Sequence, residues 1–119
     1  MKTLMINLLV FSFLSLGAQG RMEFIKEGNI VKSVEYYGQS DTVHIIGHFF
    51  DGKSHGRWTE YNPAGEVITQ AYYWLGKKEG SWLRRIDEGN NMVELEYRNN
   101  YLIGSRKWAL SDANFVAEK

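Results

Sequence analysis

Apolar and polar residues alternate with a period of two over most of this chain. From Val43 to Phe49, apolar or small groups stand at every second position, a pattern that predicts a β-strand. Similar segments begin at Val67 and Val93. Each is followed by a short segment with glycine or asparagine, where positive φ angles are expected. A second short strand then follows, so each unit is predicted to be a β-hairpin.

The hairpin unit recurs with a spacing of 24 residues. Four residues of one copy return in the next: Gly52 as Gly76, Lys53 as Lys77, Gly56 as Gly80, and Trp58 as Trp82. Weaker matches extend the repeat to about three and a half copies, which is typical of stacked supersecondary units. Because the spacing is even, a residue and its counterpart are expected on the same side of the sheet. Glycine two positions before tryptophan is expected to let the indole lie over the backbone.

We therefore predict an all-β fold over residues 21–110, built as a single elongated antiparallel meander of stacked β-hairpins. A rolled sheet or a small barrel is the alternative. Residues 111–119 are expected to form a C-terminal cap or tail.

The first 20 residues have the composition of a secretory signal. Lys2 precedes an apolar run from Leu4 to Leu16, and small residues follow at Gly17 and Ala18. A membrane-spanning helix needs about 20 apolar residues, and this run is shorter. We expect a signal helix that is cleaved from an exported protein, periplasmic or extracellular. An uncleaved anchor and a buried helix are the alternatives.

Charge and cysteine content exclude several classes of function. The 14 basic and 14 acidic residues balance, so charge favours neither nucleic acid nor an anionic membrane as a partner. Cysteine is absent from the sequence, which excludes disulfides, thiolate metal sites and thiol nucleophiles.

The histidines and one serine–histidine–acid cluster are the candidates for a chemical site. His44 and His48 are expected on one strand face, about 13 Å apart, too far to share a metal ion. Asp51, Ser54 and His55 form a triad by composition only, inside a predicted turn. We predict no catalytic residue, no cofactor and no metal site.

The repeat has a recognisable pattern of aromatic–x–x–Gly–Lys–x–x–Gly–x–Trp–x–x–Tyr–x–x–x–Gly. In the clearest copy it is carried by Phe49, Gly52, Lys53, Gly56, Trp58, Tyr61 and Gly65. This pattern resembles MORN repeats, in the variant common in bacterial proteins. The resemblance implies hairpins laid side by side. It also implies roles in protein scaffolding or membrane association, and for many bacterial versions an antitoxin label.

The positions where the copies differ are the candidate contacts for a partner. Trp74 has Phe50 and Arg98 as its counterparts, and Arg85 stands where the first copy has Tyr61. The predicted contact residues are Trp74, Tyr72, Phe50, Arg85 and Arg98. Trp58 and Trp82, which follow the repeat, are expected to form the core.

These features favour an exported repeat scaffold that binds another protein and has no catalytic activity. Two alternatives remain. The first is binding of carbohydrate or cell wall through rows of aromatic side chains, and the second is an immunity or antitoxin-like protein.

Overall fold

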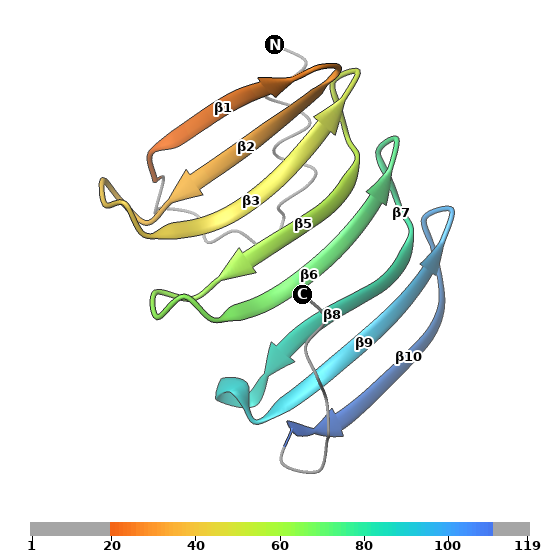
Figure 1. The fold of residues 1–119 in the computed structure, drawn as a ribbon. Helices are drawn as coiled ribbons and strands as arrows, with labels where there is room; N and C mark the ends of the chain where they lie inside the picture. The colour runs from red at the N-terminus through yellow and green to blue at the C-terminus, as the bar shows by residue number, and fades with distance from the viewer. Residues whose placement is uncertain (1–19, 111–119) are drawn as a thin grey trace.

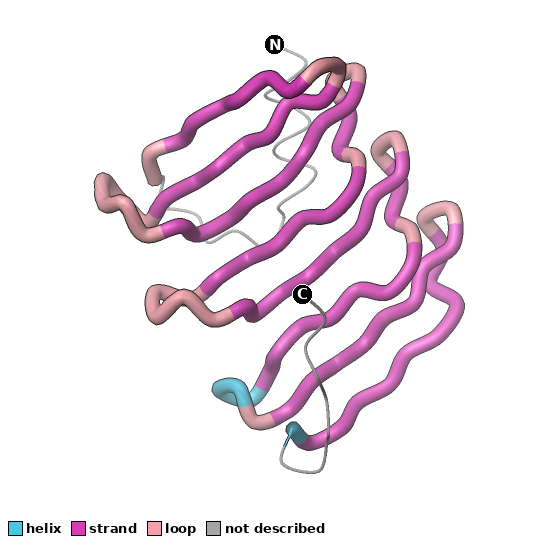
Figure 2. Tube along the Cα trace, viewed as in Figure 1, coloured by secondary structure: helices cyan, strands magenta, loops and turns pink. Residues whose placement is uncertain are grey.

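A computed structural model describes residues 20–110 of the chain, and this part is all-β (Figures 1 and 2). The strands are β1 (Met22–Glu27), β2 (Ile30–Tyr36), β3 (Val43–Phe50), β4 (Lys53–Ser54), β5 (Gly56–Tyr61), β6 (Val67–Trp74), β7 (Lys77–Lys78), β8 (Gly80–Ile86), β9 (Asn91–Arg98) and β10 (Tyr101–Ala109). A short 3-10 helix, η1 (Asp87–Gly89), joins β8 to β9.

The strands form one antiparallel sheet in the order β1-β2-β3-β5-β6-β8-β9-β10. The two-residue strands β4 and β7 pair with β3 and β6, and each leads directly into the next long strand. Every long strand therefore lies beside the strand that follows it in the chain, which confirms the predicted meander. The alternative of a closed sheet is wrong for the described residues, because β1 and β10 lie at opposite ends of the strand order (Figure 1).

Three hairpin turns have two consecutive residues with positive φ. These residues are Asp51 and Gly52 (53° and 75°), Leu75 and Gly76 (48° and 87°), and Asn99 and Asn100 (51° and 78°). Two central residues with positive φ are the signature of type I′ turns, whose twist matches that of the flanking strands. The prediction of positive φ at Gly52, Gly76 and Asn100 is confirmed.

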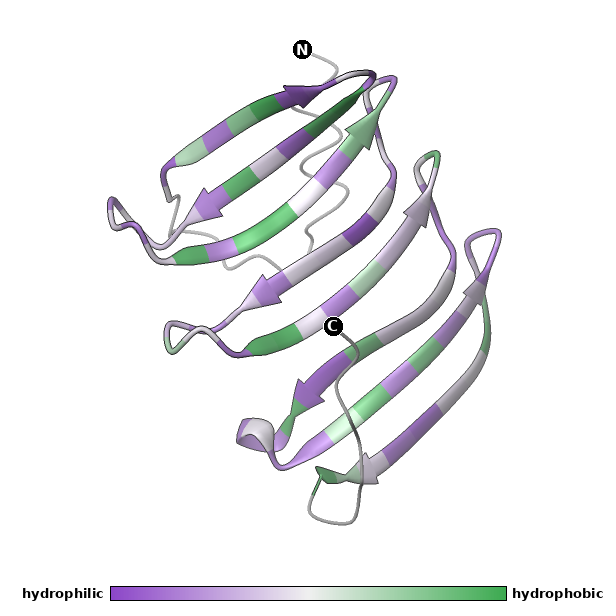
Figure 3. Cartoon of the chain, in the orientation of Figure 1, coloured by the Kyte–Doolittle hydropathy of each residue, from purple (hydrophilic) through white to green (hydrophobic). Residues whose placement is uncertain are grey.

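One side of the sheet, which we call the core face, carries the buried apolar cluster. Its members are Ile45, Phe49, Trp58, Ala71 and Tyr73, with Val31 and Trp82 packed against them. We call the other side of the sheet the opposite face. Alternation along each strand separates the two faces, and most strands carry both hydrophilic and hydrophobic bands (Figure 3).

The close approach of ring and backbone occurs at a different glycine from the one expected. A Cβ atom on Gly47 would lie 2.1 Å from Cε3 of Trp58, so the indole lies directly over the backbone of the neighbouring strand. Gly56 and Gly80, which precede the tryptophans, instead have positive φ angles of 86° and 78°, and a Cβ atom on either would meet nothing within 4 Å. These two glycines therefore allow the local bend of the backbone, and they do not make room for the indole.

The expectation that counterparts share a face holds for the inner copies and is wrong for the terminal ones. Between Ser54 and Glu60 the pairing with β3 shifts by two residues, so the face is kept. In the last hairpin, the pairing with β9 shifts by only one residue between Leu102 and Gly104. Arg106, the counterpart of Trp82, therefore points to the opposite face, because one extra residue reverses the alternation.

The expected signal segment, apart from Gly20, and the expected tail at 111–119 lie outside the described residues. Among the described residues, no helix is long and apolar enough to cross a membrane.

Candidate functional site

Three of the five predicted contact residues gather on the opposite face of the sheet. Tyr72 and Trp74 lie near the end of β6 and flank the buried Tyr73, while Phe50 ends β3. Both β6 residues are well exposed, Trp74 at 55% and Tyr72 at 41%. Trp74 is therefore available to a partner on this face.

The two predicted arginines lie on the same face, on β9 and β8. Arg98 ends β9 and occupies the place of Trp74 one repeat later. Arg85 lies near the far end of β8, where it pairs with Met92, and its guanidinium is 3.7 Å from the Glu66 carboxylate. Because β6 and β8 run antiparallel, Arg85 lies at the opposite end of the strands and does not join Trp74.

A residue that the sequence pattern assigned only to a turn organises this site. The ring of His55 lies between Phe50 and Trp74, with ring centroids at 5.5 Å and 4.5 Å. Its Nδ1 accepts a hydrogen bond of 3.1 Å from the backbone N–H of Leu75. We call the group of Phe50, His55, Tyr72, Trp74 and Leu75 the aromatic patch. The His55 ring is held by tilted contacts with Phe50 and Trp74 and by its hydrogen bond to the next turn.

The repeat itself supplies a signal that could have located His55. In the next copy, Oε1 of Glu79 accepts a bond of 2.8 Å from the backbone N–H of Asn99. His55 and Glu79 are 24 residues apart, as are Leu75 and Asn99. An acceptor side chain at this position therefore ties each hairpin turn to the turn before it.

Basic side chains surround the aromatic patch on the same face. Lys53 pairs with Phe50, Arg57 pairs with Tyr72, and Lys77 pairs with Trp74, and cross-strand partners share a face. Lys53, Arg57, Lys77 and Arg98 are all exposed, and none forms an ion pair with another described residue. The patch is thus apolar at its centre and positively charged at its rim.

The repeated tryptophans lie on the core face and pack there. Trp58 is 2% exposed, and its Nε1 donates to the carbonyl of His48 at 3.1 Å. Trp82 repeats this bond with the carbonyl of Tyr72 at 2.9 Å. Edge-to-face and tilted contacts of 5.0–6.2 Å link the rings into one ladder, Phe49–Trp58–Tyr73–Trp82–Tyr97. The prediction that these tryptophans belong to the core is confirmed for Trp58, and Trp82 is half-buried against it.

His44 belongs to a polar cluster on the core face. The His44 ring lies 3.2 Å from a carboxylate oxygen of Glu35 and 3.3 Å from one of Glu60. The expectation that His44 shares a face with His48 is wrong, because a register shift at the start of β3 leaves His44 as the extra residue of a bulge. Tyr37 stacks on the ring at 4.2 Å, and burial, followed by the nearby Glu60 and Glu35, raises the pKa of Tyr37. Both ring nitrogens of His44 are therefore engaged.

The triad suggested by composition is not assembled. Ser54 is fully buried and pairs with Phe49, which places it on the core face. The His55 ring lies on the opposite face, and its Nδ1 is bonded to Leu75. Within residues 20–110, no group of three or more His, Asp and Glu side chains is arranged to hold a metal ion.

Comparison with known proteins found no matching family model, no matching curated protein and no matching solved structure.

Proposed function

We propose that this chain is an exported repeat scaffold that binds a protein partner through the aromatic patch and has no catalytic activity of its own. The observation that carries the proposal is the difference between the tryptophans. Trp58 is buried in the ladder, whereas Trp74 is 55% exposed on the other face and in tilted contact with the His55 ring. Because the exposed Trp74 ring lies outside the buried ladder, the stability of the fold alone does not explain a tryptophan at this position.

The geometry of the patch favours a protein as the ligand. Tryptophan and tyrosine are the residues that most often dominate protein interfaces, especially where they are held in place before binding. The contacts of His55 with Phe50 and Trp74 restrain the patch in this way. A stable interface buries about 800 Å² on each partner, so the contact would extend over the basic rim.

The charge of the rim indicates the chemistry of the partner. Lys53, Arg57, Lys77 and Arg98 surround an apolar centre without acidic partners among the described residues. A complementary surface would present an apolar side chain among Asp and Glu residues. The resemblance to MORN repeats supports a scaffolding role, and the signal-like segment supports export. An immunity protein is the special case in which the partner is a toxin.

The carbohydrate alternative needs aromatic rings exposed in a row. The repeated rings form the ladder on the core face, where Trp58 and Tyr73 are buried at 2% and 5% exposure. Only Tyr72 and Trp74 remain as exposed rings in the inner repeats. This distribution favours the protein partner over a glycan.

The test compares capture of envelope proteins by the wild type, by Trp74→Ala and by Phe24→Ala. Phe24 is the matched control, because it is an aromatic side chain with 52% exposure that lies on the core face, away from the patch and its rim. A captured protein is then purified and titrated against all three. We expect Trp74→Ala to weaken binding at least about tenfold, Phe24→Ala to bind like the wild type, and binding to weaken with added salt.

Two results would contradict the proposal. One is a partner whose affinity is the same for the wild type and Trp74→Ala. The other is purified cell-wall glycan that shifts the tryptophan fluorescence of the wild type and not of Trp74→Ala, which would establish the carbohydrate alternative.

A further inference from the structure

We infer that copies of this chain assemble head to tail, with β10 of one copy pairing antiparallel with β1 of the next. β1 and β10 end the strand order, and no described residue pairs with the outer edge of either strand. An unpaired edge strand is a template for pairing with another chain. Both edges expose large apolar side chains, among them Phe24 at 52% and Leu102 at 55%.

The repeat shows which strand fits each edge. Within the chain, β5 pairs with β6 and β8 pairs with β9, so the second strand of each hairpin receives the first strand of the next. β10 is the second strand of the last hairpin and lacks this neighbour. β1 is the first strand of the first hairpin. Pairing β10 with β1 of a second copy would therefore join the same two kinds of strand that pair within the sheet.

The repeat also predicts the register of this contact. Gly56 lies opposite Tyr73, and Gly80 lies opposite Tyr97. One more repeat places Gly104 opposite Ile25 of the second copy. Gly104 pairs with Glu96, and Ile25 pairs with Lys32, which in turn pairs with His48. Glu96 and His48 both neighbour core-face residues in their strands, so Gly104 and Ile25 share the opposite face, as paired residues must.

The backbone of β1 points in the direction that this register requires. The N–H of Arg21 donates to the carbonyl of Gly38 at 2.8 Å, and its carbonyl accepts from the N–H of Tyr36 at 2.8 Å. These groups are directed toward β2. Because the direction alternates along a strand, the N–H and C=O groups of Met22 and Phe24 are directed away from the sheet.

The backbone of β10 is complementary. The N–H of Leu110 donates to the carbonyl of Asn90 at 3.0 Å, toward β9, and the pairing is regular from Gly104 onward. By the same alternation, the backbone groups of Ser105 and Lys107 are directed outward. The predicted register sets Ser105 against Phe24 of the second copy, so outward groups face outward groups and can form ladder hydrogen bonds.

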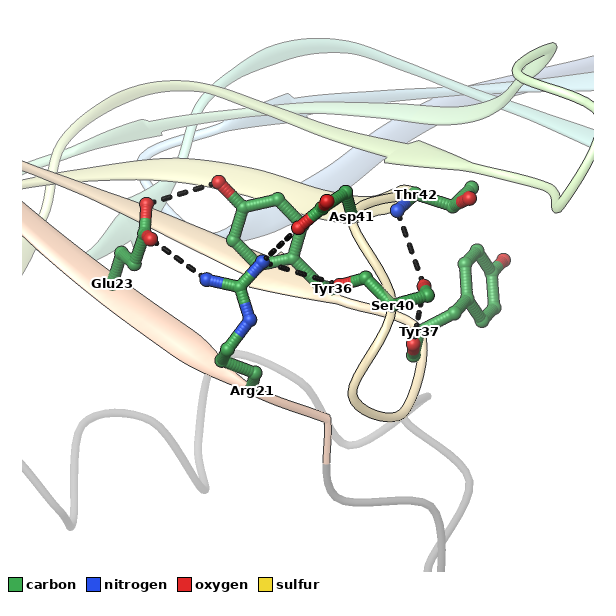
Figure 4. Close-up of polar contacts among 7 residues, drawn as sticks. All are labelled: Arg21, Glu23, Tyr36, Tyr37, Ser40, Asp41 and Thr42. Atoms are coloured by element: carbon green, nitrogen blue, oxygen red, sulfur yellow. Dashed lines mark hydrogen bonds and ion pairs between the residues drawn. The ribbon is translucent and has the colours of Figure 1, made fainter.

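Side-chain charge supports the same register. It places Arg106 opposite Glu23 of the second copy, on the face where Arg106 already bonds to Glu94. Acidic, basic and acidic side chains would then alternate across three strands. Glu23 is held in position for this contact, since it accepts bonds from Tyr36 at 3.0 Å and Arg21 at 2.7 Å (Figure 4).

The resulting contact joins two different surfaces, so it produces a ring or an open filament and not a closed pair of identical contacts. The aromatic patch lies on β3 to β7 and takes no part in it. An assembly would therefore carry one patch per copy along a continuous sheet.

The experiment measures sedimentation velocity of the purified chain, in the form that the cell produces, over a range of concentrations. Phe24→Pro removes an outward N–H of β1, and Ser105→Pro removes one of β10, which are positions an edge strand tolerates. The matched controls are Phe24→Ala and Ser105→Ala, which keep the N–H. Circular dichroism establishes that each variant keeps the sheet.

We expect the wild type and both alanine variants to form species of at least about twice the mass of one chain, growing with concentration. Each proline variant should remain a monomer. A mixture of the two proline variants should form a one-to-one dimer and nothing larger, because each contributes the edge that the other lacks. A wild type that stays monomeric, or a proline variant that dimerises alone, would overturn the inference.

A charge exchange decides the matter if either proline variant fails to fold. Glu23→Lys and Arg106→Glu should each weaken association, and the double variant should restore part of it. Association that is unchanged in both single variants would overturn the proposed register.

Discussion

The third hairpin of the sheet, from β6 to β8, and the last hairpin, β9 and β10, share a repeat position and use it differently. In the third hairpin, Gly80 has a positive φ of 78°, the register shifts by two residues, and Trp82 joins the aromatic ladder. In the last, Gly104 pairs with Glu96 in a regular ladder and is not among the residues with positive φ. Arg106 then points to the opposite face and binds Glu94.

The length of the bulge, and not the spacing of the repeat, therefore sets which face receives a side chain. Two extra residues keep the alternation, and one extra residue reverses it. A tryptophan at position 106 would lie outside the core face, so this copy can lose the tryptophan without leaving a hole in the ladder.

The largest effect should come from removing the tryptophan of an inner repeat. Trp58→Ala deletes a ring that is 2% exposed and contacts Phe49 and Tyr73, so we expect a loss of about 3–5 kcal/mol in the free energy of unfolding. Arg106→Ala, at the same repeat position, should cost under about 1 kcal/mol. Urea denaturation measures both, and equal losses would refute the comparison.

A smaller loss of stability is expected from a substitution at Gly47, where the Trp58 ring lies against the backbone. Gly47→Ala would place a Cβ atom 2.1 Å from the Trp58 ring, and such overpacking costs about 1–3 kcal/mol. The control is the same substitution in the Trp58→Ala background, where the obstacle is gone. If Gly47→Ala costs as much there as in the wild type, the contact with the ring is not the cause.

The glycines before positions 82 and 106 should respond differently to alanine. Gly80→Ala forces a Cβ into a backbone with φ of 78°, which costs about 1–2 kcal/mol. At Gly104, a Cβ would lie 4.0 Å from the Glu96 side chain, an ordinary contact, so Gly104→Ala should change stability by less than about 0.5 kcal/mol. Thermal unfolding of the two variants tests this, and a larger loss at Gly104 would be inconsistent with the two bulge types.

The smallest effect concerns the polar contacts of the last hairpin. Hydrogen bonds from Ser81 and then Arg106 hold the pKa of Glu94 below its ordinary value. A lowered pKa in the folded state contributes stability above the unfolded pKa of about 4.3, which is lost as the pH falls through the folded value. Glu94→Gln should cost under about 1 kcal/mol at pH 7, because Arg106 is largely exposed.

The pH dependence provides the check. The stability difference between wild type and Glu94→Gln should shrink as the pH is lowered from about 5. A difference that stays constant between neutral and acidic pH would show that the charge of Glu94 is not involved.

Much of the fold could be predicted because the copies of the repeat share the same kinds of turn residue and the same alternation of side chains. Positive φ at Gly52, Gly76 and Asn100 follows from the residue types that tolerate it. Burial of Trp58 and exposure of Trp74 follow from alternation within one strand and its neighbour. Alternation along β3 and β6 also places three of the proposed contacts, Phe50, Tyr72 and Trp74, on one face.

Other features depend on how strands meet. Arg85 and Trp74 both differ in residue type from their repeat counterparts. The antiparallel pairing of β6 with β8 nevertheless places them at different ends of the strands. His55 joins the aromatic patch through contacts with residues from two other segments, Phe50 and Trp74. Neither the separation of Arg85 from Trp74 nor the contacts of His55 can be predicted from the spacing of residues along the chain.

Local sequence was enough to predict the hairpin unit, its period, the turn residues and the separation of aromatic side chains into buried and exposed sets. Each of these depends on backbone preference and alternation over a few residues. Strand pairing in three dimensions sets the faces of the terminal strands, the environment of His44 and the edges at which the sheet ends. Those depend on single-residue shifts between neighbouring strands, and a shift of one residue reverses every side chain that follows it.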